Sequence, residues 1–208
     1  MLYLKNLVYH PPATATPILK GINLELAPQQ LGLIIGPSGS GKSTLLEILA
    51  GLAEPTKGSI AWGGEELTYL DLQELGGIVF QFPERHFCGK TVLEELRLGH
   101  PELGVTRIKE TLTEVGLEQI SFDTDCNQLS GGQQRRLALA VQLIRQPNLL
   151  LLDEPTAGLD WSMRRQLAKL LGKLKTHWTL LVVTHDPGEL KNIADRCWAI
   201  EQGNVKQF

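Results

Sequence analysis

Apolar residues occur along the chain in two kinds of pattern. Continuous or alternating apolar runs predict strands, apolar residues at helical spacing predict helices, and the two kinds of element alternate. Runs 31–35 and 149–152 are apolar throughout, which predicts strands covered on both faces of a sheet. Run 22–26 alternates apolar with polar residues, as a half-exposed antiparallel strand does. Alternating strands and helices favour an α/β fold with a doubly wound sheet. Further strands are predicted over 2–8, 58–62, 77–80, 179–183 and 196–200.

Helices are predicted where apolar residues recur at helical spacing between start and stop signals. They lie over 45–50, 91–98, 107–115, 131–145, 162–175 and 187–194. Between about 91 and 125 two helices follow each other without a strand, so we expect a small helical insert there. Turns are predicted at Gly63-Gly64 and Gly203-Asn204, and a proline-rich loop over 9–17.

Composition narrows the possible function classes. The chain has 208 residues with a formal net charge of −3, so no nucleic-acid partner is expected. Its three cysteines lack metal-ligand or disulfide-framework spacing, which fits a reducing compartment. We find no signal-peptide pattern, and no apolar run approaches the roughly 20 residues that span a bilayer. If the protein works at a membrane, other chains must supply the spanning part.

A glycine-rich stretch between a predicted strand and a predicted helix is the strongest chemical signal. It has the form G-x-x-x-x-G-K-[ST], and its strand–loop–helix setting predicts a phosphate-binding P-loop. Glycines let backbone N–H groups turn towards an anion, and the helix N-terminus adds partial positive charge. Lys42 is expected to reach the β- and γ-phosphates, and Ser43 to ligate Mg²⁺. The stretch comprises Gly36, Pro37, Ser38, Gly39, Ser40, Gly41, Lys42, Ser43 and Thr44.

Two carboxylates, Asp153 and Glu154, follow the apolar run 149–152. After such a strand in a P-loop NTPase, Asp153 is the expected Mg²⁺ ligand. Glu154 is then the expected base that accepts a proton from the attacking water. The pair could also be no more than acidic residues at a helix entry, where carboxylates are common. The upstream P-loop favours the catalytic interpretation.

The run Leu129-Ser130-Gly131-Gly132-Gln133 opens a predicted helix, where Ser130 also suits an N-cap. The run resembles the signature of ATP-binding cassette (ABC) ATPases, and the resemblance covers nearly the whole chain. It implies an enzyme that hydrolyses ATP to ADP and phosphate, with ATP and Mg²⁺ as the bound species. The motifs in the family's order are the P-loop, Gln81, the signature, Asp153-Glu154, Ala157-Gly158-Leu159-Asp160 and His185.

The resemblance also implies roles for single residues. Gln81 resembles the glutamine that touches Mg²⁺ and the attacking water, and His185 resembles the switch histidine that contacts the γ-phosphate. Asp160 belongs to a loop that crosses to a partner subunit. Tyr9 stands near the position where the family stacks an aromatic ring on adenine. A tyrosine there also suits packing, and the neighbouring His10 could contribute instead.

In this family the signature of one subunit faces the ATP held by the other. We therefore expect the signature to complete a partner's nucleotide site, because the N–H groups at a helix N-terminus attract an anion there as they do in the P-loop. The residues concerned are Ser130, Gly131, Gly132 and Gln133. The implied assembly is a head-to-tail dimer, either a homodimer or a heterodimer with a second ABC ATPase.

For the fold, the resemblance implies a single ABC ATPase domain over 1–208. It would be an α/β P-loop NTPase with a central, mostly parallel sheet, an antiparallel β subdomain and a small helical signature subdomain. Residues 1–90 and 147–208 are assigned to the RecA-like core with the antiparallel β part. Residues from about 91 to 146 are assigned to the helical subdomain.

Most members of the family drive transport, and the chain favours that role over DNA repair or translation. The stretch between Gln81 and the signature is too short for the coiled coils of repair members, and one cassette is present where translation members typically have two. We expect a peripheral ATPase at the cytoplasmic face of a membrane, attached to separate membrane-spanning subunits that move a solute. The alternative is a soluble ABC ATPase acting in nucleic-acid repair, translation or protein-complex remodelling.

The pattern Gln81-x-Pro83-Glu84 is similar to the ATPase subunits of energy-coupling factor importers and of cobalt or nickel uptake systems. Those systems take up vitamins or metal cations. The alternative is a generic loop that fits another kind of transporter. The residues expected to dock a helix of the membrane partner are Phe82, Glu84, Arg85 and Phe87.

Overall fold

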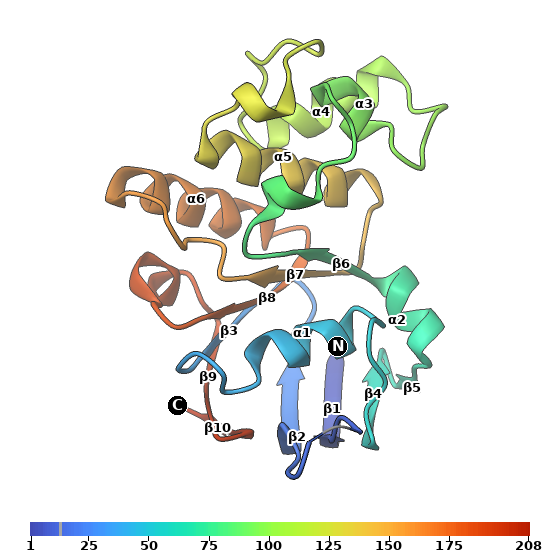
Figure 1. Ribbon diagram of the computed structural model, residues 1–208, viewed down its shortest axis with the longest axis vertical. Coiled ribbons are helices and arrows are strands. Elements are labelled where there is room, and N and C mark those ends of the chain that lie inside the picture. Colours follow the sequence, from blue (N-terminus) through green and yellow to red (C-terminus); the bar gives the residue numbers. More distant parts are fainter. Residues whose placement is uncertain (13) are drawn as a thin grey trace.

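A computed structural model describes residues 1–12 and 14–208 and shows a central sheet with other elements on both faces (Figure 1). Within these residues the sheet has six strands in the order β10-β9-β3-β8-β7-β6. Neighbouring strands are parallel, except that β10 pairs antiparallel with β9 at one edge. These strands are β3 Leu31–Ile35, β6 Gly76–Val79, β7 Leu149–Asp153, β8 Thr179–Thr184, β9 Arg196–Glu201 and β10 Asn204–Gln207.

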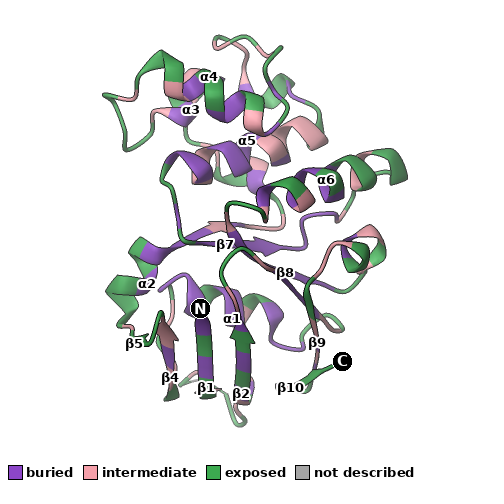
Figure 2. Cartoon of the chain, turned by 180° about the vertical axis from the view of Figure 1, so that it is seen from behind, coloured by how far each residue is buried: buried purple, intermediate pink, exposed green. Residues whose placement is uncertain are grey.

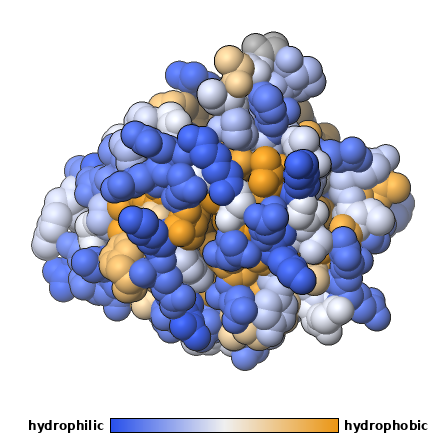
Figure 3. Space-filling view, turned by 90° about the horizontal axis from the view of Figure 1, so that it is seen from below, coloured by the Kyte–Doolittle hydropathy of each residue, from blue (hydrophilic) through white to orange (hydrophobic). Residues whose placement is uncertain are grey.

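A smaller antiparallel sheet lies below the central one in Figure 1 and has the order β2-β1-β4-β5 in the described part of the chain. Along β1 and β2, buried and exposed residues alternate (Figure 2), because one face packs on the core and the other faces solvent. Seen from below, this end of the molecule is mostly hydrophilic, with hydrophobic groups in its hollows (Figure 3). The strands are β1 Leu2–Tyr9, β2 Leu19–Leu26, β4 Lys57–Trp62 and β5 Glu65–Glu66.

The central strands are apolar throughout because other elements cover both faces of the central sheet. In β7, Leu150 and Leu152 pack into a core with the helices of one face. Leu149 and Leu151, which point the other way, pack with α1 Lys42–Leu49 and the antiparallel sheet. A strand with this environment needs an apolar residue at every position. The predicted α/β fold with a mostly parallel sheet is therefore confirmed.

The helices on the other face form a layer of α5 Gly131–Ile144 and α6 Trp161–Leu174, with α3 Val92–Leu96 and α4 Val105–Glu114 beyond it (Figure 1). The predicted helical insert is thus present as α3 and α4. Its boundaries near 91 and 146 stay a prediction, since residues on both sides of them share one hydrophobic core. No helix among the described residues has the length and apolar character to cross a bilayer.

Some elements differ from the sequence prediction. Helix α2 Tyr69–Leu75 was not predicted, although Thr68 and Asp71 form a capping box at its start. The helix predicted over 187–194 is a short 3₁₀ helix, Gly188–Asn192. The predicted loop 9–17 includes residue 13, which lies outside the described residues.

The last predicted turn is displaced by one residue. It lies at Gln202-Gly203, where both φ angles are positive, 48° and 80°. Tight two-residue hairpins between twisted strands require such angles at both central residues. Asn204 therefore does not belong to the turn and begins strand β10, which was not predicted.

Candidate nucleotide site

The residues predicted to carry chemistry come from neighbouring strands of the central sheet. Strand β3 leads into the P-loop, β8 into His185, β7 into Glu154, and β6 runs towards Gln81. In the parallel register Ile35 pairs with Thr184, and Asp153 pairs with Val183, so the carboxyl ends of these strands lie together. Open α/β sheets bind their ligands at this edge.

A cleft of about 390 Å³ at this edge brings together nine of the predicted site residues. Ile18, directly before β2, also contributes to its wall and was not predicted. The cleft therefore unites the P-loop with residues that follow three other strands. It is lined by Ile18, Ser38, Gly39, Gly41, Lys42, Ser43, Thr44, Gln81, Glu154 and His185.

The P-loop needs glycine for more than one reason. A Cβ on Gly36 would lie 2.3 Å from the carbonyl oxygen of Ile200, so no side chain fits there. Gly39 and Gly41 have φ angles of 77° and 103°, in the left-handed region that glycine adopts without strain. The chain can thus turn tightly from β3 into the N-terminus of α1.

Lys42 lies at the base of the cleft and is only 6% exposed. Its Nζ donates hydrogen bonds to the carbonyl oxygens of Gly36, at 2.8 Å, and Pro37, at 3.0 Å. It also lies 3.6 Å from Glu154 Oε1. Phosphate oxygens carry more negative charge than these carbonyls and can compete for the ammonium group.

Glu154 occupies the centre of the polar network. Its carboxylate accepts hydrogen bonds from Thr184 Oγ1 at 2.8 Å and from the His185 backbone N–H at 2.9 Å. His185 Nδ1 lies 2.9 Å from Glu154 Oε1. The Glu154 backbone has a φ of 46°, a conformation that residues other than glycine adopt only when the surrounding structure holds them there. Thr184 was not predicted, although its hydroxyl ends an apolar strand directly before His185.

Asp153 is buried beside Ser43 with one oxygen left free. It is 8% exposed, and its Oδ1 has no hydrogen-bond partner in the described part of the chain. Burial raises the pKa of this carboxyl, and a hydrogen bond from Ser43 opposes the rise. A free carboxylate oxygen next to a hydroxyl suits Mg²⁺, which prefers oxygen ligands. The described residues contain no group of three or more His, Cys, Asp or Glu side chains that could hold a metal ion.

We expect Asp153→Asn to stabilise the nucleotide-free protein. The folded-state pKa of Asp153 lies above its ordinary value of 3.8, so at neutral pH the buried charge disfavours the folded state. Thermal unfolding at pH 7 should show a gain of about 0.5–2 kcal/mol. The gain should fade as the pH falls through the folded-state pKa, where the native carboxyl becomes neutral. A variant no more stable than the native chain at pH 7 would contradict the burial argument.

The signature residues do not line the cleft of their own chain. Ser130 is the N-cap of α5, and its Oγ accepts a hydrogen bond from Gln133 N at 3.4 Å. Gln133 Oε1 accepts one from Ser130 N at 2.8 Å, which completes a capping box. Asp160 likewise caps α6, accepting from Met163 N at 2.9 Å. Within one chain these residues act as helix caps, and their contact with a partner's nucleotide stays a prediction.

The adenine-stacking residue also stays a prediction. Tyr9 lies at the end of β1, pairs with Leu19 and packs partly against the core, whereas Ile18 lines the cleft. His10 Nε2 lies 2.8 Å from the carbonyl oxygen of Thr14.

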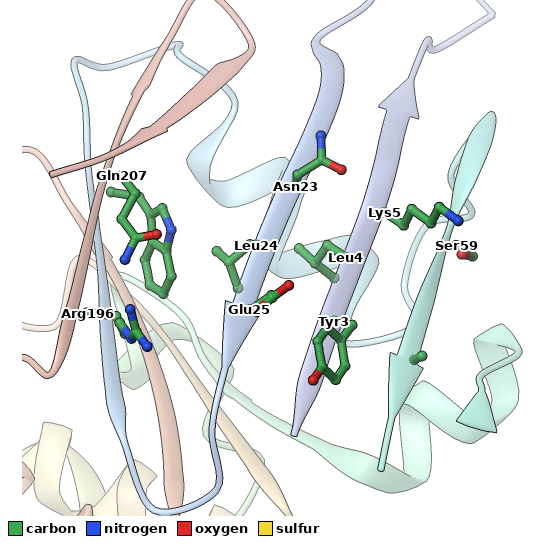
Figure 4. Close-up of a pocket in the computed structure, with 11 residues that line it drawn as sticks. Tyr3, Leu4, Lys5, Asn23, Leu24, Glu25, Ser59, Arg196 and Gln207 are labelled. Carbon is green, nitrogen blue, oxygen red and sulfur yellow. The ribbon is translucent and has the colours of Figure 1, made fainter. Parts of the chain in front are cut away.

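A larger hollow, of about 520 Å³, lies away from the predicted residues. The outer face of β1, β2 and β4 forms one side of it, and β9 and β10 form the other. Figure 4 shows Arg196 on β9 and Gln207 on β10. On the opposite side it shows Glu25 on β2 and Tyr3 on β1. None of the motif residues lines this hollow, so size alone does not identify the functional site.

Comparison with known proteins places the chain among transporter subunits. The family described as "ABC transporter" matches residues 19–157. The chain is 49% identical to the chloroplastic ABC transporter I family member 11 of Arabidopsis thaliana, over 97% of this chain and 78% of that protein. It is 36% identical to the energy-coupling factor transporter ATP-binding protein EcfA2 of Streptococcus sanguinis, with the same coverage of both chains, 97% and 78%.

A solved structure agrees with the sequence matches. The cbiO1 protein of Clostridium perfringens, part of the ABC transporter complex cbiONQ, superimposes with a TM-score of 0.90. The two chains are 30% identical, and the match covers 99% of this chain and 86% of that one.

Proposed function

Since the chain belongs to the ABC transporter family and is an ATPase, we propose that it powers solute uptake through separate membrane-spanning subunits. The proposal extends to an importer of the energy-coupling factor type that takes up a vitamin or a metal cation. The observation that carries it is the cleft in which the P-loop, Gln81 and Glu154 converge. Relatives named as an ABC transporter family member and as a transporter ATP-binding protein favour this role over a soluble ATPase of repair or translation.

In the proposed site the phosphates of ATP lie over the P-loop, with Lys42 towards the β- and γ-phosphates. Glu154 takes the proton of the attacking water, because its carboxylate lines the cleft 3.6 Å from Lys42 and is therefore close to the expected γ-phosphate. His185 then faces the γ-phosphate. Ser43, Asp153 and Gln81 are the residues that would hold Mg²⁺. When bound, Mg²⁺ neutralises charge on the phosphates.

The proposed catalytic unit is a head-to-tail dimer, a homodimer or a heterodimer with a second ABC ATPase. Ser130, Gly131, Gly132 and Gln133 of one subunit close over the ATP of the other, and Asp160 lies at the same interface. Exposure of Ser130 and Gly131 at the N-terminus of α5 supports this arrangement, because N–H groups there attract anions. Tyr9, with His10 as the alternative, lies against adenine at the rim.

A separate groove, of about 230 Å³, supports docking of a helix from the membrane-spanning subunit. It lies between the end of β6, the 3₁₀ helix η1 Pro83–His86 and the helices α3 and α5. Phe87 lines it, and Phe82 stands exposed next to η1 with the Arg85 guanidinium 4.5 Å from the centre of its ring. The groove is lined mainly by apolar groups, which suits an amphipathic helix.

We expect Phe82→Ala to reduce solute uptake by about tenfold or more while ATP affinity changes less than about twofold. The side chain is 38% exposed and lies outside the nucleotide cleft, so its loss affects docking more than binding. Uptake into proteoliposomes and ATP binding would be measured on the same preparation. Tyr69→Ala is the matched control, since Tyr69 is an aromatic residue 45% exposed on α2. Unchanged uptake in Phe82→Ala would refute this docking surface.

Copurification tests the proposed function as a whole. A tagged chain should recover membrane proteins with several spans, and the reconstituted complex should couple ATP hydrolysis to uptake of one solute. Recovery of nucleic acid or ribosomes without membrane proteins would contradict the transport role.

A further inference from the structure

Arg135 is a buried cation that the sequence motifs do not account for. It lies in α5 five residues after Ser130 and is 8% exposed. Neighbouring side chains include Val79, Leu152 and Pro155, which are apolar. A charged residue within the apolar face of a helix is unusual unless it is paired or hydrogen-bonded.

The guanidinium group of Arg135 joins two loops that carry site residues. Its Nη1 donates a hydrogen bond to the carbonyl oxygen of Gln81 at 2.9 Å, and its Nη2 donates to the carbonyl oxygen of Ala157. Gln81 follows β6 and lines the nucleotide cleft. Ala157 follows Glu154 closely, and its N–H donates to the Glu154 carbonyl oxygen at 3.0 Å. Arg135 therefore contacts both loops directly.

The charge of Arg135 has no close carboxylate partner. No acidic oxygen lies within ion-pair distance of it among the residues that the structure describes, and its Nε has no hydrogen-bond acceptor there. Burial lowers the pKa of the guanidinium, and the charge of Glu84 opposes this effect. The carbonyl oxygens of Gln81 and Ala157 accept the hydrogen bonds of this guanidinium, so moving either loop away would leave part of a buried charge unsatisfied.

We propose that Arg135 is a positioning residue that couples the Gln81 loop, the Glu154–Asp160 segment and the N-terminus of α5. The inference rests on the proposed function, in which that N-terminus meets a partner's ATP. Ser130 caps α5, and Arg135 lies five residues further along the same helix, a rise of about 7.5 Å. Because both belong to one helix, we expect them to move as one rigid body. A shift of α5 on dimer closure would be passed to Gln81 and Ala157 together. Glu84, one of the residues predicted to dock the membrane partner, is close enough for its charge to raise the pKa of Arg135.

The test compares the kinetics of Arg135→Ala, Arg135→Lys and the parent chain in the complex with its membrane partners. For Arg135→Ala, kcat should fall about 10- to 100-fold, as small misplacements of catalytic groups do, while KM for ATP stays within about threefold. Arg135→Lys should recover part of the loss, because an ammonium keeps the charge but lacks the planar fork that reaches both carbonyls. Thermal unfolding is measured on every variant.

Arg107→Ala is the matched control. Arg107 Nη2 donates to the carbonyl oxygen of Leu143 at the other end of α5, at 3.3 Å, and lies outside the nucleotide cleft. Its loss should leave kcat within about twofold, since surface contacts of this kind contribute little.

A double variant with Gln81→Ala gives the sharper readout. If Arg135 acts through the Gln81 loop, the Arg135→Ala effect should shrink at least about threefold in the Gln81→Ala background. The proposal would be overturned if the loss of kcat in the double variant equals the product of the losses in the two single variants. It would also be overturned if Arg135→Ala keeps a kcat within twofold of the parent. If Arg135→Ala does not fold, a parent-like kcat in Arg135→Lys overturns it as well. Failure of the proposed function is distinct, since the parent complex itself would then show no coupled hydrolysis.

Discussion

Glu154→Gln is expected to lower kcat for ATP hydrolysis by about 100- to 10,000-fold, the range that follows from loss of a general base. The amide has nearly the shape of the carboxylate, and its one oxygen, in the place of Oε2, can still accept hydrogen bonds from Thr184 Oγ1 and from the His185 N–H. It cannot take a proton from water at neutral pH. Binding contacts from Lys42 to the phosphates are unaffected, so ATP should stay bound and the dimer should stay closed.

Two measurements check this expectation. Steady-state phosphate release gives kcat, and size-exclusion chromatography with ATP gives the fraction of dimer, which should rise in the variant. Glu114→Gln is the matched control, because Glu114 accepts a hydrogen bond from Trp178 Nε1 at 3.2 Å and lies outside the cleft. Near-normal hydrolysis in Glu154→Gln would refute the assignment of Glu154 as the base.

Gly131→Asp should abolish turnover without harming the isolated protomer. A Cβ on Gly131 meets no atom within 4 Å, and a carboxylate in the first turn of α5 is favourable to that helix. In a closed dimer the same carboxylate would repel the γ-phosphate of the partner's ATP. We expect kcat to fall about 100-fold or more, with unchanged ATP binding to the protomer and no loss of thermal stability.

Gly104→Asp is the matched control for this variant. Gly104 is the N-cap of α4, its added Cβ also meets nothing within 4 Å, and no predicted site includes it. Its kcat should equal that of the parent. Equal inactivation of both variants would show that the loss is not specific to the signature.

Mixing variants tests whether the site is shared between chains. Lys42→Ala lacks the phosphate-binding ammonium but keeps its signature, and Gly131→Asp has the reverse defect. In a homodimer formed by random exchange, half of the dimers are mixed and each holds one intact site, so activity should return to about a quarter of the parent value. An inactive mixture that contains mixed dimers would contradict a site built from both chains.

The motifs were predictable because each is contiguous in sequence, and all but the signature lie at or after the end of a strand. The P-loop, Asp153-Glu154 and His185 each follow an apolar strand, and the fold class follows from strands that alternate with helices. Burial on both faces explains why the run 149–152 could be assigned correctly without any tertiary information.

Contacts between distant segments could not be predicted in the same way. Thr184 Oγ1 reaches Glu154, and Arg135 reaches Gln81, across intervals of 30 and 54 residues. Helix α2 was missed because it is short, although its capping box was a usable local signal. The signature residues form ordinary helix caps within one chain, so their expected role depends on a second subunit.

Residue types and spacing were thus sufficient to identify the family resemblance and the chemistry of each motif. The meeting of these motifs depends on strand order. Because β3, β8, β7 and β6 are neighbours and parallel, their carboxyl ends bring Lys42, His185, Glu154 and Gln81 to one cleft. No local pattern encodes that order. It follows from how the whole chain buries its apolar surface, and so does the position of Arg135 between the loops that it joins.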